Sequence, residues 1–111
     1  MKFLSIATMK DAMFTLPPAT ARQLTEANLA FMKQQRQAGK ILEAYIIPGW
    51  KRSVVISEAK SAEEIVQNFN EMPGMGLMDI EIYPLADWDE SMKYVIEGLK
   101  RVEQQSPAPP K

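Results

Sequence analysis

The 111-residue chain contains no cysteine and no histidine. Their absence excludes disulfides, thiolate or imidazole metal sites, cysteine nucleophiles and the Ser–His or Cys–His pairs of nucleophilic catalysis. A metal could be held only by oxygen ligands, and the sequence has no Asp- and Gly-rich calcium loop. We therefore expect no metal site. The chemistry left to the chain is that of carboxylates, amines, guanidinium groups, hydroxyls and amides.

An excess of charge of one sign and long apolar runs are also missing. The 13 basic and 14 acidic residues give a net charge of −1 and form no basic cluster, so we expect no nucleic-acid surface. No run approaches the roughly 20 apolar residues that span a bilayer. The apolar run 3–8 is too short for a signal-peptide core, and the expected location is the cytoplasm, away from membranes.

What the chain does have is enough apolar content, 46%, for one hydrophobic core. We expect residues 1–104 to form a single domain and the proline-rich residues 105–111 to be a disordered tail. A domain of this size buries a modest share of its surface, so association with a second copy of itself, as a dimer or higher oligomer, is expected.

Apolar periodicity and turn residues divide the chain into strand, helix, strand, strand, helix, strand and a final helix. The expected strands are residues 2–9, 42–47, 53–57 and 78–83, the last of them stopped by Pro84. Residues 10–19 are expected to be a loop, and 48–51 a hairpin turn.

The expected helices have recognisable start and stop signals. The pairs Thr20 with Gln23, Ser61 with Glu64 and Asp87 with Glu90 each have the capping-box spacing. Gly39 is expected to end the first helix, at Ala38, in the left-handed conformation. The third helix is expected over 87–104. The apolar stripes are Leu24, Ala27, Phe31 and Met32; Ile65, Val66 and Phe69; and Met92, Val95, Ile96, Leu99 and Val102.

This order of elements favours an α+β fold of the split-βαβ, ferredoxin-like type, with a four-stranded antiparallel sheet and helices on one face. The other face would carry alternate strand residues. These are Glu43, Tyr45 and Ile47, and Asp79, Glu81 and Tyr83. A bare face of this mixed character favours a partner sheet that encloses a cavity, as in a dimeric α+β barrel.

Three segments resemble the muconolactone isomerase family. They are the Gln- and Arg-rich turn 35–40, the helix start 61–64, and Met72-Pro73 followed after four residues by the Met-Asp-Ile-Glu-Ile run 78–82. The resemblance covers roughly residues 1–86 and leaves the helix 87–104 outside. It implies a small oligomeric enzyme that moves a proton and a double bond in a lactone, without metal or organic cofactor.

The resemblance also bears on the residues that would act. The family has a glutamate on the first helix where this chain has Asn28, and a histidine near the second strand where it has Glu43. Moving a proton needs a carboxylate or similar base over an acidic C–H, with donors that steady the enolate. We expect Glu81 or Glu43 to be the catalytic proton carrier. Asn28 and Tyr45 would orient the substrate, and Trp50 would form a wall.

Each of these residues has a structural alternative. Asn28 would bond to backbone or lie at a subunit edge, and the carboxylates Glu43 and Glu81 would be solvated or form ion pairs between strands or subunits. Trp50 would pack at a subunit interface.

Three functions remain open. The first is a cofactor-independent enzyme acting by proton transfer on a small organic acid or lactone. The second, favoured by the missing histidine and by Asn28, is a non-catalytic ligand-binding or assembly module. The third is a cofactor-free monooxygenase on the same type of dimeric barrel.

Overall fold

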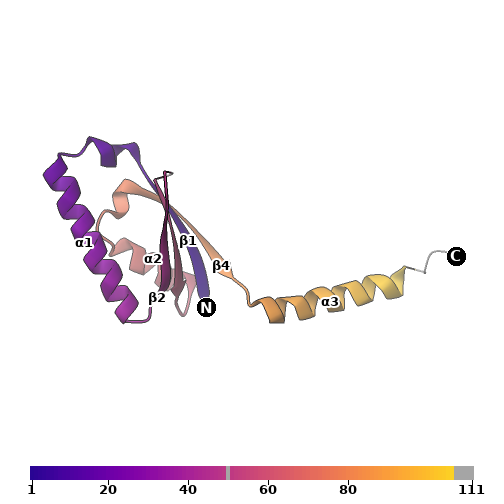
Figure 1. Cartoon of the computed structure of the whole chain (residues 1–111). Helices are drawn as coiled ribbons and strands as arrows, with labels where there is room; N and C mark the ends of the chain where they lie inside the picture. The colour runs from indigo at the N-terminus through magenta and orange to yellow at the C-terminus, as the bar shows by residue number, and fades with distance from the viewer. Residues whose placement is uncertain (50, 107–111) are drawn as a thin grey trace.

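The computed structural model describes residues 1–49 and 51–106 (Figure 1). Trp50 and residues 107–111 lie outside the described residues, and with them the predicted site wall and most of the predicted tail. The elements are β1 (Lys2–Met9), η1 (Asp11–Thr15), α1 (Pro18–Gln37), β2 (Ile41–Ile47), β3 (Arg52–Glu58), α2 (Ala62–Asn70), η2 (Met75–Leu77), β4 (Met78–Leu85) and α3 (Trp88–Gln105).

The four strands form one antiparallel sheet in the order β2-β3-β1-β4. Figure 1 shows α1 and α2 together on one side of this sheet. This arrangement confirms the predicted α+β, split-βαβ fold. The two β-α crossovers place β1 and β3 at the centre, and the sheet edges fall on β2 and β4.

The hydrophobic core lies between the sheet and these two helices. Successive side chains of a strand point to opposite faces, so Phe3 faces the helices and Leu4 faces away. Phe3 and Ile65 are each only 1% exposed, and they cluster with Ala59, Phe69 and Ile82. The core therefore joins β1, α2 and β4.

The opposite side of the sheet, here called the open face, has an aliphatic centre and polar edges. The register aligns Glu43, Ile56, Leu4 and Tyr83 in one cross-strand row and Tyr45, Val54, Ile6 and Glu81 in the next. Tyr45 is 61% exposed and Tyr83 is 47% exposed. The alternation predicted from the sequence is thus observed, and the face is not covered within the chain.

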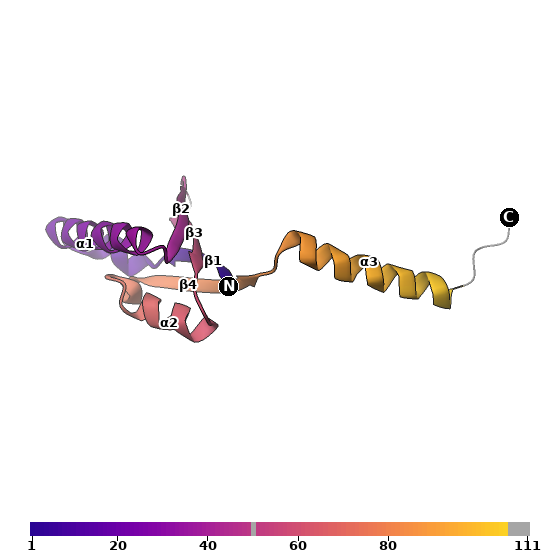
Figure 2. The same cartoon turned by 90° about the horizontal axis from the view of Figure 1, so that it is seen from below.

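The last helix, α3, stands apart from the rest of the chain (Figures 1 and 2). The radius of gyration is 20.3 Å, against about 13 Å expected for a compact domain of this length. The apolar stripe of α3 is largely exposed, with Leu99 at 64% and Val102 at 58%. Among the described residues, no helix is long and apolar enough to cross a membrane.

Two of the three predicted helix starts are confirmed. Ser61 Oγ accepts a hydrogen bond from the Glu64 amide at 3.2 Å, and Asp87 Oδ2 accepts one from the Glu90 amide at 3.0 Å. The prediction that Thr20 caps the first helix is wrong, because α1 already begins at Pro18. Proline suits the first turn, since its missing N–H would have no partner there. Gly39 has a φ of 75°, as the left-handed cap requires.

Several boundaries and faces differ from the predictions. β4 does not stop at Pro84 but continues to Leu85, because a proline is tolerated on an edge strand. The expected loop 10–19 contains η1. Val66, expected on the buried side of α2, is 52% exposed, and Gln105, expected in the tail, is the last residue of α3.

The contrast between Ile65 and Val66 gives a stability test. Ile65→Ala should lower the free energy of unfolding by about 2–5 kcal/mol, because it leaves a cavity in the core. Val66→Ala, its neighbour on the exposed side of α2, should change it by less than about 0.5 kcal/mol. Urea unfolding measures both, and equal losses would contradict the position of the core.

Candidate functional site

The structure forms a small, partly open pocket, here called the inner cavity, between the sheet and the two helices that cover it. Its volume is about 70 Å³. The lining residues are Ser5, Ala7, Asn28, Phe31, Met32, Gln35, Lys40, Ile41, Ser53, Val55, Ser57, Ile65, Asn68, Phe69, Met72 and Met78.

The inner cavity combines apolar walls with amides and hydroxyls. Asn28, Gln35 and Asn68 supply amides, and β1 and β3 supply serine hydroxyls. Its ionisable lining residue is Lys40, and no carboxylate is among the described residues that line it. Such a lining can hydrogen-bond an oxygen-bearing ligand, but it offers no carboxylate base.

The Asn28 amide and the Ser5 hydroxyl, both in the inner cavity, differ in their hydrogen bonding. Asn28 Nδ2 donates a hydrogen bond to the Pro73 carbonyl at 3.2 Å, which ties α1 to the connection between α2 and β4. The alternative in which this amide bonds to backbone is therefore observed. Ser5 is 1% exposed, and its Oγ has no hydrogen-bond partner within the described part of the chain. The Ser5 hydroxyl is thus left available to a guest.

The open face carries a second, different set of polar groups. Tyr83 Oη donates to Glu81 Oε2 at 2.8 Å on β4, and Tyr45 Oη donates to Glu43 Oε1 at 3.3 Å on β2. The two pairs sit on opposite edges of the sheet, three strand spacings or about 14 Å apart. Glu43 and Glu81 therefore do not act on the same atom within one chain.

The pair on β4 is electrostatically coupled. The hydrogen bond to the Glu81 carboxylate, together with its negative charge, raises the pKa of Tyr83 above the ordinary tyrosine value of 10.0, and the positive charge of Arg52 opposes the rise. The phenol therefore keeps its proton across the neutral range. A phenol held protonated beside a carboxylate can serve as a hydrogen-bond donor.

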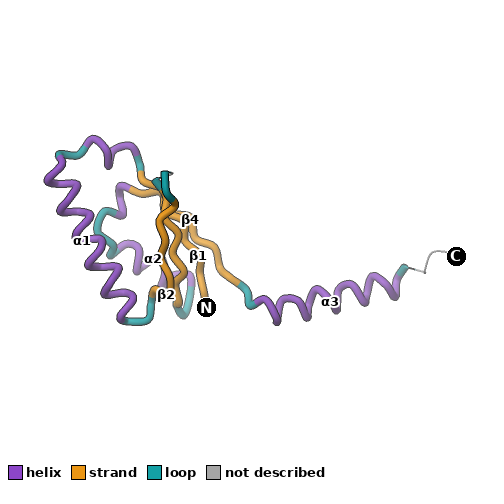
Figure 3. Tube along the Cα trace, in the orientation of Figure 1, coloured by secondary structure: helices purple, strands orange, loops and turns teal. Residues whose placement is uncertain are grey.

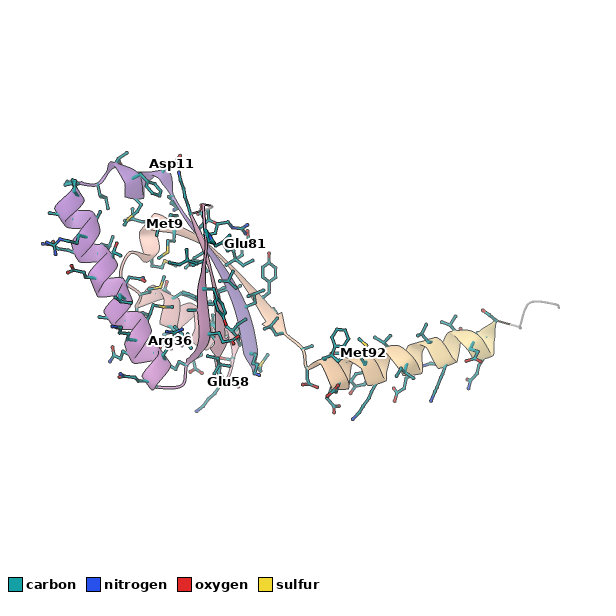
Figure 4. All side chains as sticks on the ribbon, viewed as in Figure 1. Met9, Asp11, Arg36, Glu58, Glu81 and Met92 are labelled. Atoms are coloured by element: carbon teal, nitrogen blue, oxygen red, sulfur yellow. The ribbon has the colours of Figure 1, made fainter. Side chains whose placement is uncertain are left out.

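The structure does not bring all the predicted site residues together. Asn28 lines the inner cavity on the helix side, whereas Glu43, Tyr45 and Glu81 lie on the open face. Figure 4 shows Glu81 on the side of the sheet turned away from α1. The four-stranded sheet separates the two groups, so no single enclosed constellation forms within one chain.

Sequence reasoning missed most of the polar lining of the inner cavity. Ser5 and Ser57 are 1% and 5% exposed, on strand positions that face the helices and that would usually be apolar. A serine at alternate positions of a strand, among aliphatic residues, was the signal that could have found them. The described residues contain no group of three or more acidic side chains able to hold a metal ion.

Several solved structures share this fold, and two of them are described here. A muconolactone isomerase crystal structure aligns with a TM-score of 0.68 and 24% identity, covering 78% of this chain and 90% of that one. The 5-chloro-2-hydroxyhydroquinone dehydrochlorinase of Burkholderia phenoliruptrix, in complex with 2,5-dihydroxybenzoquinone, aligns with a TM-score of 0.65 and 18% identity, covering 81% and 98%. No curated protein matches the chain in sequence.

The family comparison covers most of the chain. The model of the muconolactone delta-isomerase family matches residues 1–91, which hold all four strands, α1 and α2, and end shortly after α3 begins. The segments that carried the resemblance in the sequence, from the turn 35–40 to the run 78–82, lie within this match. The chain belongs to the muconolactone delta-isomerase family.

Proposed function

We propose that the chain is an enzyme that moves a proton in a small organic acid or lactone, with Glu81 as the proton carrier. The observation that supports this most directly is the 2.8 Å hydrogen bond from Tyr83 to the Glu81 carboxylate on the open face. Membership of the muconolactone delta-isomerase family supports the reaction class.

The chemistry follows from the two side chains and their surroundings. The Glu81 carboxylate takes a proton from a C–H next to a carbonyl and returns it at another carbon. Once Glu81 holds that proton it no longer needs the Tyr83 hydrogen bond, so the single Tyr83 O–H turns and donates to the oxygen on which negative charge develops. Leu4 and Ile6, which pair with Tyr83 and Glu81 across β1, give the substrate an apolar floor.

This site works only when water is excluded from it. Glu81 is exposed in the single chain, and an exposed carboxylate is a weak base at neutral pH. A second copy over the open face would dry the site and strengthen the Tyr83–Glu81 interaction. In this proposal Glu43 with Tyr45 is a polar pair at the β2 edge that does not carry the proton, and Trp50 keeps its role as a wall.

Replacing the carrier tests the mechanism. Glu81→Gln keeps the size of the side chain and should lower kcat by about 10²-fold or more, as the loss of a general base does. Glu43→Gln is the matched control at the other edge and should retain most of the turnover. Assays with muconolactone and related small lactones measure this. Full activity in Glu81→Gln would remove the residue from the mechanism.

The coupling of Tyr83 to its neighbour can be measured independently of turnover. Absorbance of the phenolate should show one tyrosine that ionises above pH 10.0, and Glu81→Gln should bring that titration back toward the ordinary value, because the negative charge is gone. Glu43→Gln should leave the high titration in place. A high titration that survives Glu81→Gln would contradict the pairing.

A second candidate function is ligand binding without proton transfer, in the inner cavity. It is favoured by the absence of a carboxylate among the described lining residues, and by an amide, Asn28, where the family resemblance places a glutamate. Asn28, Gln35 and the free Ser5 hydroxyl would then bind the oxygens of an acid, lactone or quinone.

Binding measurements separate the two candidates. With 2,5-dihydroxybenzoquinone and muconolactone as probes, Gln35→Leu should weaken binding about tenfold if the inner cavity is used. Gln34→Leu, the same change on the exposed side of α1, should have no effect. Calorimetry measures both. Turnover that is lost in Glu81→Gln but unchanged in Gln35→Leu would exclude the inner cavity as the functional site. Oxygen uptake with an electron-rich phenol would instead indicate a monooxygenase.

A further inference from the structure

We propose that Arg52 binds a carboxylate of the substrate on the open face, and so makes the protein specific for compounds that carry an acid group. The inference rests on the proposed function, because it assigns the end of the substrate that Glu81 does not touch. It adds a specificity-determining residue to the Glu81–Tyr83 pair.

The strand register places Arg52 on the open face, beside the row that contains Glu81. Arg52 pairs with Thr8 of β1, which lies four residues after Leu4 and therefore also faces away from the helices. Glu81 pairs with Ile6, one row along the same strand. Figure 3 shows the strands as one layer with α1 and α2 on the other side. Neither of these helices separates Arg52 from Glu81.

The positive charge of Arg52 has no anionic partner among the residues that the structure describes. Their ion pairs do not include it, and Asp79, which lies in the same cross-strand row, contacts Lys10 at 3.8 Å instead. The side chain of Arg52 is nevertheless partly buried. Removing a charge from water without a partner costs free energy. A ligand carboxylate would supply the partner, and the guanidinium can bind it through two parallel N–H···O bonds.

The charge of Arg52 also acts on the proton-transfer pair. The hydrogen bond and charge of Glu81 raise the pKa of Tyr83, and the positive charge of Arg52 lowers it. Because Coulomb interactions weaken with distance, this effect indicates that the guanidinium lies over the open face on the side of β4. An anionic substrate is repelled by the Glu81 carboxylate, and a cation at its other end offsets that repulsion.

The spacing of the two groups limits the size of the substrate. β3 and β4 are two strand spacings apart and the rows differ by two residues, so the Cα atoms of Arg52 and Glu81 lie about 12 Å apart. Side chains stand roughly perpendicular to a sheet, so their charged ends keep a similar separation. The contacts to the carboxylate and to the C–H take up about 6 Å of it. About 6 Å then remains for the substrate, over the apolar floor of Ile6 and Val54.

Lys2 is a second cation on the strands of the open face, and it supplies a matched control. It pairs with Leu85, four residues along β4 from Glu81, at the opposite end of the sheet from Arg52. Its side chain is exposed, and an exposed ammonium group gains little from an ion pair. Removing either charge changes the net charge of the chain equally.

Binding tests the assignment without turnover. Muconolactone, which carries a carboxylate, and its uncharged methyl ester are titrated by calorimetry into the full-length chain, and also into Glu81→Gln. We expect the acid to bind at least tenfold more tightly than the ester. Arg52→Gln should abolish this preference, and Lys2→Gln should leave it unchanged. Arg52→Lys should keep part of it, because lysine retains the charge but not the bidentate geometry.

Four outcomes would overturn the inference. They are equal affinity for acid and ester in the natural chain, no binding of the acid at millimolar concentration, a preference that survives Arg52→Gln, and a preference that Lys2→Gln removes instead. None of them depends on whether Glu81 carries the proton. Full turnover in Glu81→Gln would refute the proposed function, while the affinities would still decide the role of Arg52.

Kinetics separate a binding role of Arg52 from a structural one. Arg52→Gln should raise KM for the acid at least tenfold and change kcat by less than about threefold, because the ion pair is made equally in the ground state and the transition state. The ester should be turned over as well by Arg52→Gln as by the natural chain. An equal loss for both substrates would contradict a role in carboxylate binding.

Discussion

A four-stranded sheet has two faces, and this chain has helices for only one of them. Phe3, Ile65 and Phe69 close the helix side around a small core. The other side keeps the aliphatic residues of β1 and β3 in contact with water, flanked by carboxylates and tyrosines at both edges. Burial of apolar area is the main favourable term in folding and association, so the uncovered face is the surface on which the proposed function depends.

The sheet also divides the candidate chemistry in two. On the helix side, amides and serine hydroxyls surround a space of about 70 Å³ in which Asn28 takes part. On the other side, Glu81 and Tyr83 form a donor–acceptor pair that is exposed in the single chain. A ligand held behind the sheet would be out of reach of Glu81, so the two candidate functions use different surfaces. Membership of the muconolactone delta-isomerase family accounts for the fold. The surface that a ligand uses would decide between an enzyme and a binding protein.

Two of the three helix-start signals in the sequence were reliable, and so was the signal for the end of the first helix. Ser61 and Asp87 cap their helices because the bonded amides lie three residues away, and Gly39 ends α1 because the left-handed conformation suits glycine. The prediction that Pro84 stops β4 was wrong because it depended on residues far away in the sequence. Whether a proline stops a strand depends on whether that strand lies at the edge of the sheet, and only the tertiary pairing of β4 with β1 decides this.

The sequence by itself determined the order of elements, the split-βαβ fold and the faces on which Glu43, Tyr45 and Glu81 lie, because the two-residue period of a strand is a local property. Only the tertiary structure decided that Asn28 is separated from these residues by the thickness of the sheet, and that Ser5, Ser57 and Asn68 share its cavity. It also decided that α3 stands apart from the other described elements of its own chain. Those facts depend on which segments pack together across long stretches of sequence. An amphipathic pattern shows that a surface will be buried, but it does not show what buries it.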